Sequence, residues 1–150
     1  MSPPPAHALT DADASLVAGL RLVVMRLARR LRQQAEGGLT ASRLSALSTI
    51  ARLGPLTLGE LAGVEQVQPP SMTRIVANLE EQGLVIREVD PQDRRVARVR
   101  VSDEGSAYVA RSRTLKNAYL AERLDRFDPL ERARLAEALP LLERLVGDDR

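Results

Sequence analysis

The hydrophobic period of this chain changes twice, and that change limits the folds open to it more than any other feature. Apolar residues recur at steps of three or four up to about residue 83, a spacing that predicts helices. Two β-branched runs follow at 84–89 and 96–101, and a polar segment separates them. The second run alternates apolar residues with arginine, as a half-exposed strand does. The helical period then returns, so we expect a mainly α protein with a small β-hairpin.

Capping and stop signals divide the first helical part into four helices. A long helix at about 13–36 should begin at Asp11 or Asp13 and end at Gly37–Gly38. Thr40 should cap a second helix, which Gly54–Pro55 ends. The sequence Thr57-Leu58-Gly59-Glu60 is a capping box and predicts a short third helix. Pro69–Pro70 predicts the start of a fourth, because proline lacks the amide that the first turn leaves unpaired.

The same signals place two helices after the hairpin. Ser102 should cap a helix that runs to about Arg126, with acidic residues in its first turn. Asp128, Pro129 and Glu131 then form a second capping box with proline in the first turn. The helical period predicts the buried faces of the three helices before the hairpin to be Leu44, Leu47, Ile50, Ala51, Leu58, Leu61, Ala62, Met72, Ile75, Val76 and Leu79.

This order of elements predicts a winged helix-turn-helix, from about 40 to 101, flanked by N- and C-terminal dimerisation helices at about 13–36 and 103–146. Residues 1–10 contain three consecutive prolines and are expected to form a disordered tail. Residues 11–150 should then form a single domain. In such modules the second helix of the turn lies in the major groove and the hairpin reaches the minor groove.

Composition excludes several classes of function. The chain has no Cys and a single His, at position 7, which argues against disulfides, thiol redox sensing, a metal site and a bound cofactor. No apolar run is long enough to span a membrane, so we expect a soluble, cytoplasmic protein with no membrane partner. We also expect no enzymatic activity. The acidic pair Glu80 and Glu81 diverges on a helix, and no His, Cys or Gly-rich phosphate loop accompanies it.

The fourth predicted helix, at about 69–82, has an outward face suited to DNA. Helical projection turns Arg74 and Asn78 away from the apolar stripe, with Ser71 and Thr73 on the flanks. Arg74 can donate two hydrogen bonds to guanine or hold a phosphate. Alternatively, Ser71 and Thr73 cap the helix and Arg74 is a solvated surface residue. The near absence of lysine is ambiguous too, since a GC-rich genome also favours arginine codons.

The polar segment at 90–95 is the second candidate contact. Acidic residues beside Arg94 and Arg95 suit a finger that holds one guanidinium by ion pairing and presents the other to the minor groove. Arg87, Arg98 and Arg100 would extend the basic surface behind it. An ordinary charged hairpin turn explains the same residues equally well.

Two motifs in register resemble the MarR family of transcriptional regulators. The run from Gln68 to Arg74, followed by Asn78-Leu79-Glu80 and Gly83-Leu84-Val85, resembles the recognition helix and first wing strand of that family. The segment 90–95, followed by Val101-Ser102 and Gly105, resembles its wing. Val101-Ser102 stands where Leu-Thr is usual. The resemblance implies a homodimer that binds a pseudo-palindromic operator in double-stranded DNA, usually as a repressor, with affinity often lowered by a small molecule.

On this sequence, the resemblance implies DNA contacts at Gln68, Ser71, Thr73, Arg74 and Asn78 in the major groove and at Arg94 or Arg95 in the minor groove. It leaves open whether a small-molecule effector exists, since Tyr108, Tyr119 and Phe127 fit a core better than a ligand-binding wall. The rival interpretation is a winged-helix protein-interaction module without DNA binding.

Dimerisation has an argument of its own in the outer helices. Their apolar stripes exceed what one small winged module can cover, and exposed stripes of this size promote aggregation. Burial against a second copy would stabilise them by roughly 25 cal/mol per Å². The residues expected in this interface are Leu16, Leu20, Leu139, Leu142 and Leu145.

Overall fold

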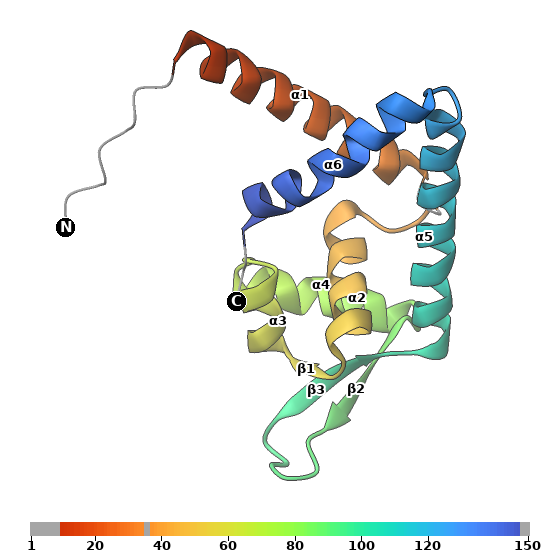
Figure 1. The fold of residues 1–150 in the computed structure, drawn as a ribbon. Helices are drawn as coiled ribbons and strands as arrows, with labels where there is room; N and C mark the ends of the chain where they lie inside the picture. The colour runs from red at the N-terminus through yellow and green to blue at the C-terminus, as the bar shows by residue number, and fades with distance from the viewer. Residues whose placement is uncertain (1–9, 35–36, 148–150) are drawn as a thin grey trace, which may run out of the picture.

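The computed structural model describes residues 10–34 and 37–147 and has the expected element order, with one strand added (Figure 1). The helices are α1 (Asp11–Gln34), α2 (Ala41–Leu53), α3 (Leu58–Val64), α4 (Pro69–Glu81), α5 (Asp103–Leu124) and α6 (Pro129–Val146). The strands are β1 (Leu56–Thr57), β2 (Val85–Val89) and β3 (Ala97–Val101). The predicted disordered tail lies outside the described residues, except for Thr10.

Side-chain caps define where the helices begin. The caps predicted at Thr40, Thr57, Ser102 and Asp128 are confirmed, and Thr57 and Asp128 form full capping boxes. The cap predicted for α1 is wrong. Thr10 takes that place, because its hydroxyl accepts from the Asp13 amide at 3.2 Å while the Asp13 carboxylate accepts from the Thr10 amide at 3.2 Å.

The sheet is antiparallel, in the order β1-β3-β2. The hairpin pairs Val85 with Val101 and Val89 with Ala97, in agreement with the predicted strands. The strand β1, which pairs Leu56 with Val99, was not predicted. Its two residues are too few to show an alternating pattern, and the second of them, Thr57, is also the cap of α3.

The hydrophobic core lies between α2, α3, α4 and the sheet, and Tyr108 of α5 closes it. Most of the predicted core is confirmed, but Ala51, Leu58 and Ile75 are only half-buried. The core also includes residues that were not in the predicted faces, namely Ala46, Leu84, Val85 and Val99. Of the three predicted aromatic core residues, Tyr108 is buried, whereas Tyr119 is half-buried and Phe127 is exposed.

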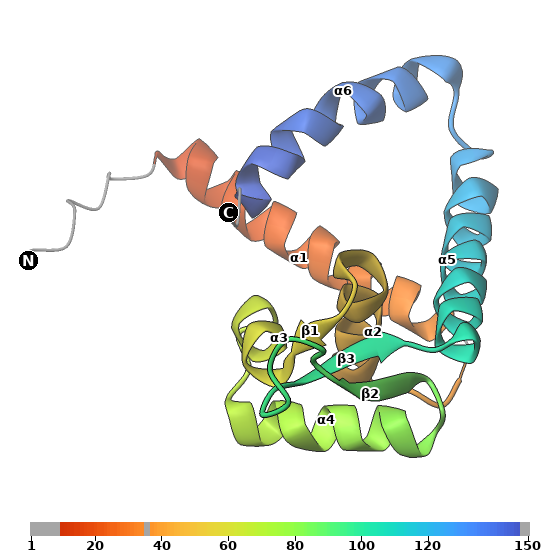
Figure 2. The same cartoon turned by 90° about the horizontal axis from the view of Figure 1, so that it is seen from below.

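Helices α1 and α6 extend away from this core (Figure 2). In the single chain, none of the described residues of either helix is buried. Leu16, Leu139, Leu142 and Leu145 are exposed and Leu20 is half-buried. Within the described residues, no helix is both long and apolar enough to cross a membrane.

Candidate nucleic-acid interface

Helix α4 is held in one rotation by its buried stripe. Met72, Val76 and Leu79 are fully buried against α2 and α3, and Pro69 and Pro70 occupy the first turn. This rotation exposes Arg74 and the other side chains of the first turns. The fold therefore places an exposed arginine near the start of a rigid helix, in agreement with the helical projection.

The polar candidates on α4 differ in how free their side chains are. Gln68 is exposed at the N-cap position and makes no side-chain cap bond, and Ser71 is also exposed. The Thr73 hydroxyl donates to the Pro69 carbonyl oxygen at 3.0 Å. Asn78 is half-buried, and its side-chain oxygen accepts from the side-chain Nε2 of Gln82 at 2.6 Å. The alternative that Ser71 and Thr73 cap the helix is wrong, because Gln68 occupies that position.

The loop between β2 and β3 is shaped by its two aspartates. One Asp90 oxygen accepts from the Gln92 amide at 2.8 Å, and the other accepts from Arg98 Nε at 2.6 Å. Asp93 accepts from the backbone amide of Arg95 at 3.0 Å. The predicted ion pair with Arg94 or Arg95 is therefore wrong. Both side chains are exposed and make no ion pair with any described residue.

The arginines behind the tip do not extend a basic surface, contrary to the prediction. Each has a carboxylate partner on an adjacent element or strand. The pairs are Arg87 with Glu80 at 3.0 Å, Arg98 with Asp90 and with Glu60 at 3.4 Å, and Arg100 with Glu88 at 2.5 Å. Because these pairs neutralise the wing strands, unpaired positive charge on this side is concentrated at α4 and the wing tip.

Three arginines of this region form no ion pair with any described residue. Arg74, on α4, and Arg94 and Arg95, in the β2–β3 loop, have no ion-pair partner in the part of the chain that the structure describes. The loop projects from the end opposite α1 and α6 (Figure 1), and in the view from below α4 runs along the side opposite α6 (Figure 2). We refer to Arg74, Arg94 and Arg95 as the free arginines. Among the described residues, no group of His, Cys, Asp and Glu could hold a metal ion.

We expect the Asp90–Arg98 pair to make the order of the wing depend on pH. Hydrogen bonds, first from Arg98 and then from the Gln92 amide, hold the pKa of the Asp90 carboxyl below its usual 3.8. A carboxylate with a lowered pKa stabilises the fold above its unfolded pKa, and this stabilisation is lost as the pH falls through the folded value. The wing should therefore stay ordered at neutral pH and loosen below pH 3.8.

NMR titration of the Gln92 and Asp93 amides measures this transition. At the Gln92 amide, we expect a midpoint below 3.8 in the parent and loss of that transition in Asp90→Asn, which keeps an acceptor but loses the charge. A parent midpoint at or above 3.8 would show that Asp90 does not hold the wing.

The geometry defines a class of protein. A helix-turn-helix pair, α3 and α4, packs on α2, and an antiparallel hairpin projects beside it with unpaired arginines at its tip. This is a winged helix-turn-helix, the arrangement expected from the sequence.

Comparisons with known proteins identify the family. The MarR family model matches residues 39–97. The chain is 41% identical over 141 residues to an HTH-type transcriptional regulator of Mycobacterium leprae, covering 93% of this chain and 99% of the relative. A crystal structure of a Pseudomonas aeruginosa transcriptional regulator protein, 36% identical, superposes with a TM-score of 0.84 over 93% of this chain and 99% of that one.

A MarR family protein from Bacillus stearothermophilus, 26% identical, superposes with a TM-score of 0.80 over 90% of this chain and 95% of that one. This chain belongs to the MarR family of helix-turn-helix transcriptional regulators.

Proposed function

We propose that this regulator is a repressor that binds a pseudo-palindromic operator in double-stranded DNA as a homodimer. The observation that carries the proposal is that the three free arginines lie exposed on α4 and the wing tip while their neighbours are ion-paired. A Bacillus subtilis relative, 28% identical over 97 residues, is named as a transcriptional repressor, MdtR, which supports the direction of regulation.

The two kinds of free arginine suit two kinds of contact. Arg74 projects from a helix whose rotation is fixed, so it can read base edges in the major groove. Arg94 and Arg95 project from a loop, and a narrow minor groove attracts guanidinium groups through its negative potential. Gln68 and Ser71, which are exposed beside Arg74, can donate to phosphates or bases.

Selection of bound sequences from random DNA duplexes tests the proposal directly. We expect a near-palindrome whose half-site centres lie about 10 bp apart, because two recognition helices of a dimer enter successive turns of one groove. The affinity should fall steeply as salt rises, since each neutralised phosphate releases counterions. Failure to enrich any sequence, together with binding that is insensitive to salt, would favour the protein-interaction module instead.

Alanine substitutions separate the two kinds of contact. Arg74→Ala should reduce the free energy of binding to the operator by about 1–3 kcal/mol. It should also reduce the difference in affinity between the operator and random DNA. Arg94→Ala and Arg95→Ala should weaken binding to both and reduce the salt slope by about one unit for each phosphate that is no longer neutralised. The control is Arg100→Ala, because Arg100 is on the wing but paired with Glu88. Equal binding by the parent and all three test variants would disprove the assignment of this surface.

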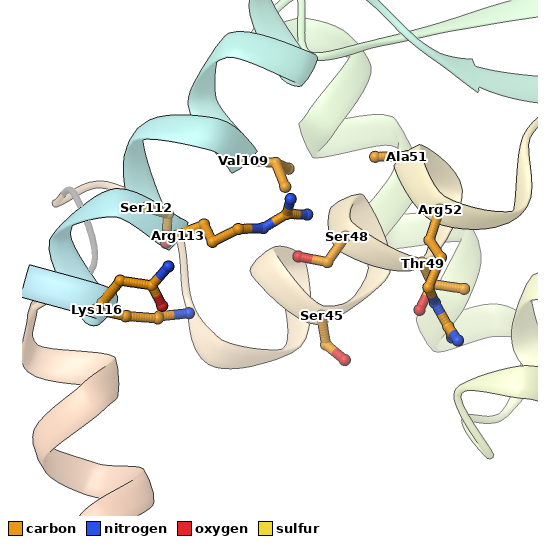
Figure 3. A pocket seen from close by; sticks show the side chains of 10 residues that line it. Ser45, Ser48, Thr49, Ala51, Arg52, Val109, Ser112, Arg113 and Lys116 are labelled. Carbon is orange, nitrogen blue, oxygen red and sulfur yellow. The ribbon is translucent and has the colours of Figure 1, made fainter. Parts of the chain in front are cut away.

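The effector is proposed to be a small anion that binds between α2 and α5. A cavity of about 490 Å³ opens there, lined by side chains of which Arg52, Arg113 and Lys116 are cationic. Figure 3 shows Arg113 and Lys116 extending from α5 toward α2. The Ser112 hydroxyl beside them is buried with no hydrogen-bond partner among the described residues, so a ligand could supply one.

The lining of this cavity favours a polar ligand over an aromatic compound, because it includes no aromatic side chain among the described residues. A thermal-shift screen of small carboxylates would identify a ligand. Arg113→Ala should remove the shift and leave operator binding intact. A shift that persists in this variant would place the ligand elsewhere.

A further inference from the structure

One carboxylate ties the turn between α3 and α4 to helix α2. The Ser45 hydroxyl donates to one oxygen of Glu65 at 2.7 Å, and the Thr49 hydroxyl donates to the other at 2.5 Å. Ser45 and Thr49 are one helical turn apart on α2, so a single carboxylate reaches both. Glu65 is half-buried and Thr49 is buried, which partly shields the Thr49 hydrogen bond from water, whereas Ser45 is exposed. We call these three side chains the Glu65 clamp.

The clamp lies in the turn that leads from α3 into α4. Glu65 is the C-cap of α3. The next residue, Gln66, adopts a left-handed backbone conformation with a φ of 51°, which residues other than glycine rarely adopt. The Val67 amide then donates to the Ala62 carbonyl oxygen at 3.0 Å, and α4 begins at Pro69. The buried stripe of α4 fixes its rotation, whereas the turn fixes where its first residues lie.

We infer that Glu65 is a positioning residue for DNA binding, which holds the start of the recognition helix in place through Ser45 and Thr49. The inference rests on the proposed DNA-binding function of α4. The first turns of that helix, which follow the clamp in the chain, carry Ser71 and Arg74, the residues assigned to the major groove. Loss of the clamp lets this end of α4 shift, and the bidentate geometry that Arg74 needs is then lost.

The sign of one substitution distinguishes positioning from simple electrostatics. Glu65 carries negative charge, so its neutralisation would strengthen binding to the negatively charged DNA if only charge mattered. Glu65→Gln keeps the size of the side chain but replaces one acceptor oxygen with an NH₂ group. One hydroxyl must then turn round to accept, and both hydrogen bonds lose the charged acceptor that made them strong. We therefore expect Glu65→Gln to bind the selected operator about tenfold more weakly than the parent.

Glu81→Gln is the matched control. Glu81 is an exposed carboxylate at the end of α4 with no side-chain hydrogen bond or ion pair among the described residues, so its neutralisation should leave binding unchanged or strengthen it. Operator binding by Glu65→Gln that equals or exceeds that of the parent would overturn the inference.

A double-mutant cycle tests whether Glu65 acts through the two hydroxyls. Ser45→Ala combined with Thr49→Val removes both donors and should weaken operator binding about as much as Glu65→Gln does. Adding Glu65→Gln to this pair should have no further effect, because the interaction is already absent. Fully additive losses would show that Glu65 does not position the helix through Ser45 and Thr49. If the Thr49 variant fails to fold, the cycle can be measured with Ser45→Ala and Glu65→Gln alone, because Ser45 is exposed.

Hydrogen exchange provides a readout that needs no DNA. In Glu65→Gln, the amides of Val67 and Ser71 should exchange faster, while the amide of Gly54, at the far end of α2, should be unchanged. Unchanged exchange at Val67 and Ser71 would overturn the clamp. If the parent selects no operator but these amides exchange faster in Glu65→Gln, the proposed function is wrong. The structural role of the Glu65 clamp would still be supported.

Discussion

Replacement of Leu142 or Leu145 by aspartate is expected to raise the dissociation constant of the proposed dimer more than 100-fold. Both leucines lie on α6, and both are exposed in the single chain. Burying one leucine side chain contributes about 1.5–3 kcal/mol, and a two-fold interface contains each residue twice, so the loss is about 3–6 kcal/mol. The charge of the aspartate adds a further desolvation penalty.

Sedimentation velocity at micromolar concentration measures the effect. The parent should sediment as a dimer and each variant as a monomer. Val89→Asp is the control, since Val89 is also an apolar, exposed residue but lies on β2, far from α1 and α6 in sequence. If both α6 variants still sediment as dimers, the dimer interface must lie on another surface.

Gly105→Ala should destabilise the fold by about 3 kcal/mol, although alanine is normally the better helix former. A Cβ at Gly105 would lie 2.0 Å from the Leu84 carbonyl oxygen and 2.9 Å from a Val101 methyl group. The same carbonyl accepts from the Ser102 amide at 3.0 Å, and the Ser102 hydroxyl caps α5. The added methyl group would therefore push α5 away from the hairpin at the point where the strand passes into the helix.

Urea unfolding of the parent and the variant gives the free-energy difference. Gly63→Ala is the matched control: this glycine is also helical, in α3, and no atom lies within 4 Å of the place that an added Cβ would occupy. That substitution should stabilise the protein by about 0.5–1 kcal/mol. If Gly105→Ala is as stable as the parent, α5 can move away from the hairpin without a loss of folding free energy.

The features that could be predicted from the sequence are those that depend on nearby residues. Caps such as Thr57 with Glu60, the proline start of α4 and the buried stripe of Met72 and Val76 all act over three or four positions. Each of them was confirmed. The exposed position of Arg74 was predictable because it follows from that stripe alone.

The choice of ion-pair partners could not be predicted in the same way. Several arginines lie within a few residues of Glu88, Asp90 and Asp93. The sequence therefore allows many alternative ion pairs between these carboxylates and arginines. The hairpin and its loop decide among them: Glu88 lies opposite Arg98 but pairs with Arg100, two residues further along β3, while Arg98 pairs with Asp90 of the loop. The contacts of Glu60 with Arg98 and of Glu65 with Ser45 and Thr49 join residues far apart in the chain, and no local pattern indicates them.

The neutralised wing strands have a consequence for how a regulator finds its site among an excess of other DNA. Nonspecific binding depends on the number of phosphates that a protein can neutralise, and it retains proteins on sequences that they do not regulate. Because Arg87, Arg98 and Arg100 are already paired with carboxylates, they have less charge to offer to arbitrary DNA. On the proposed assignment, a larger share of the molecules stays free to search, and occupancy of the operator depends on sequence more than on charge.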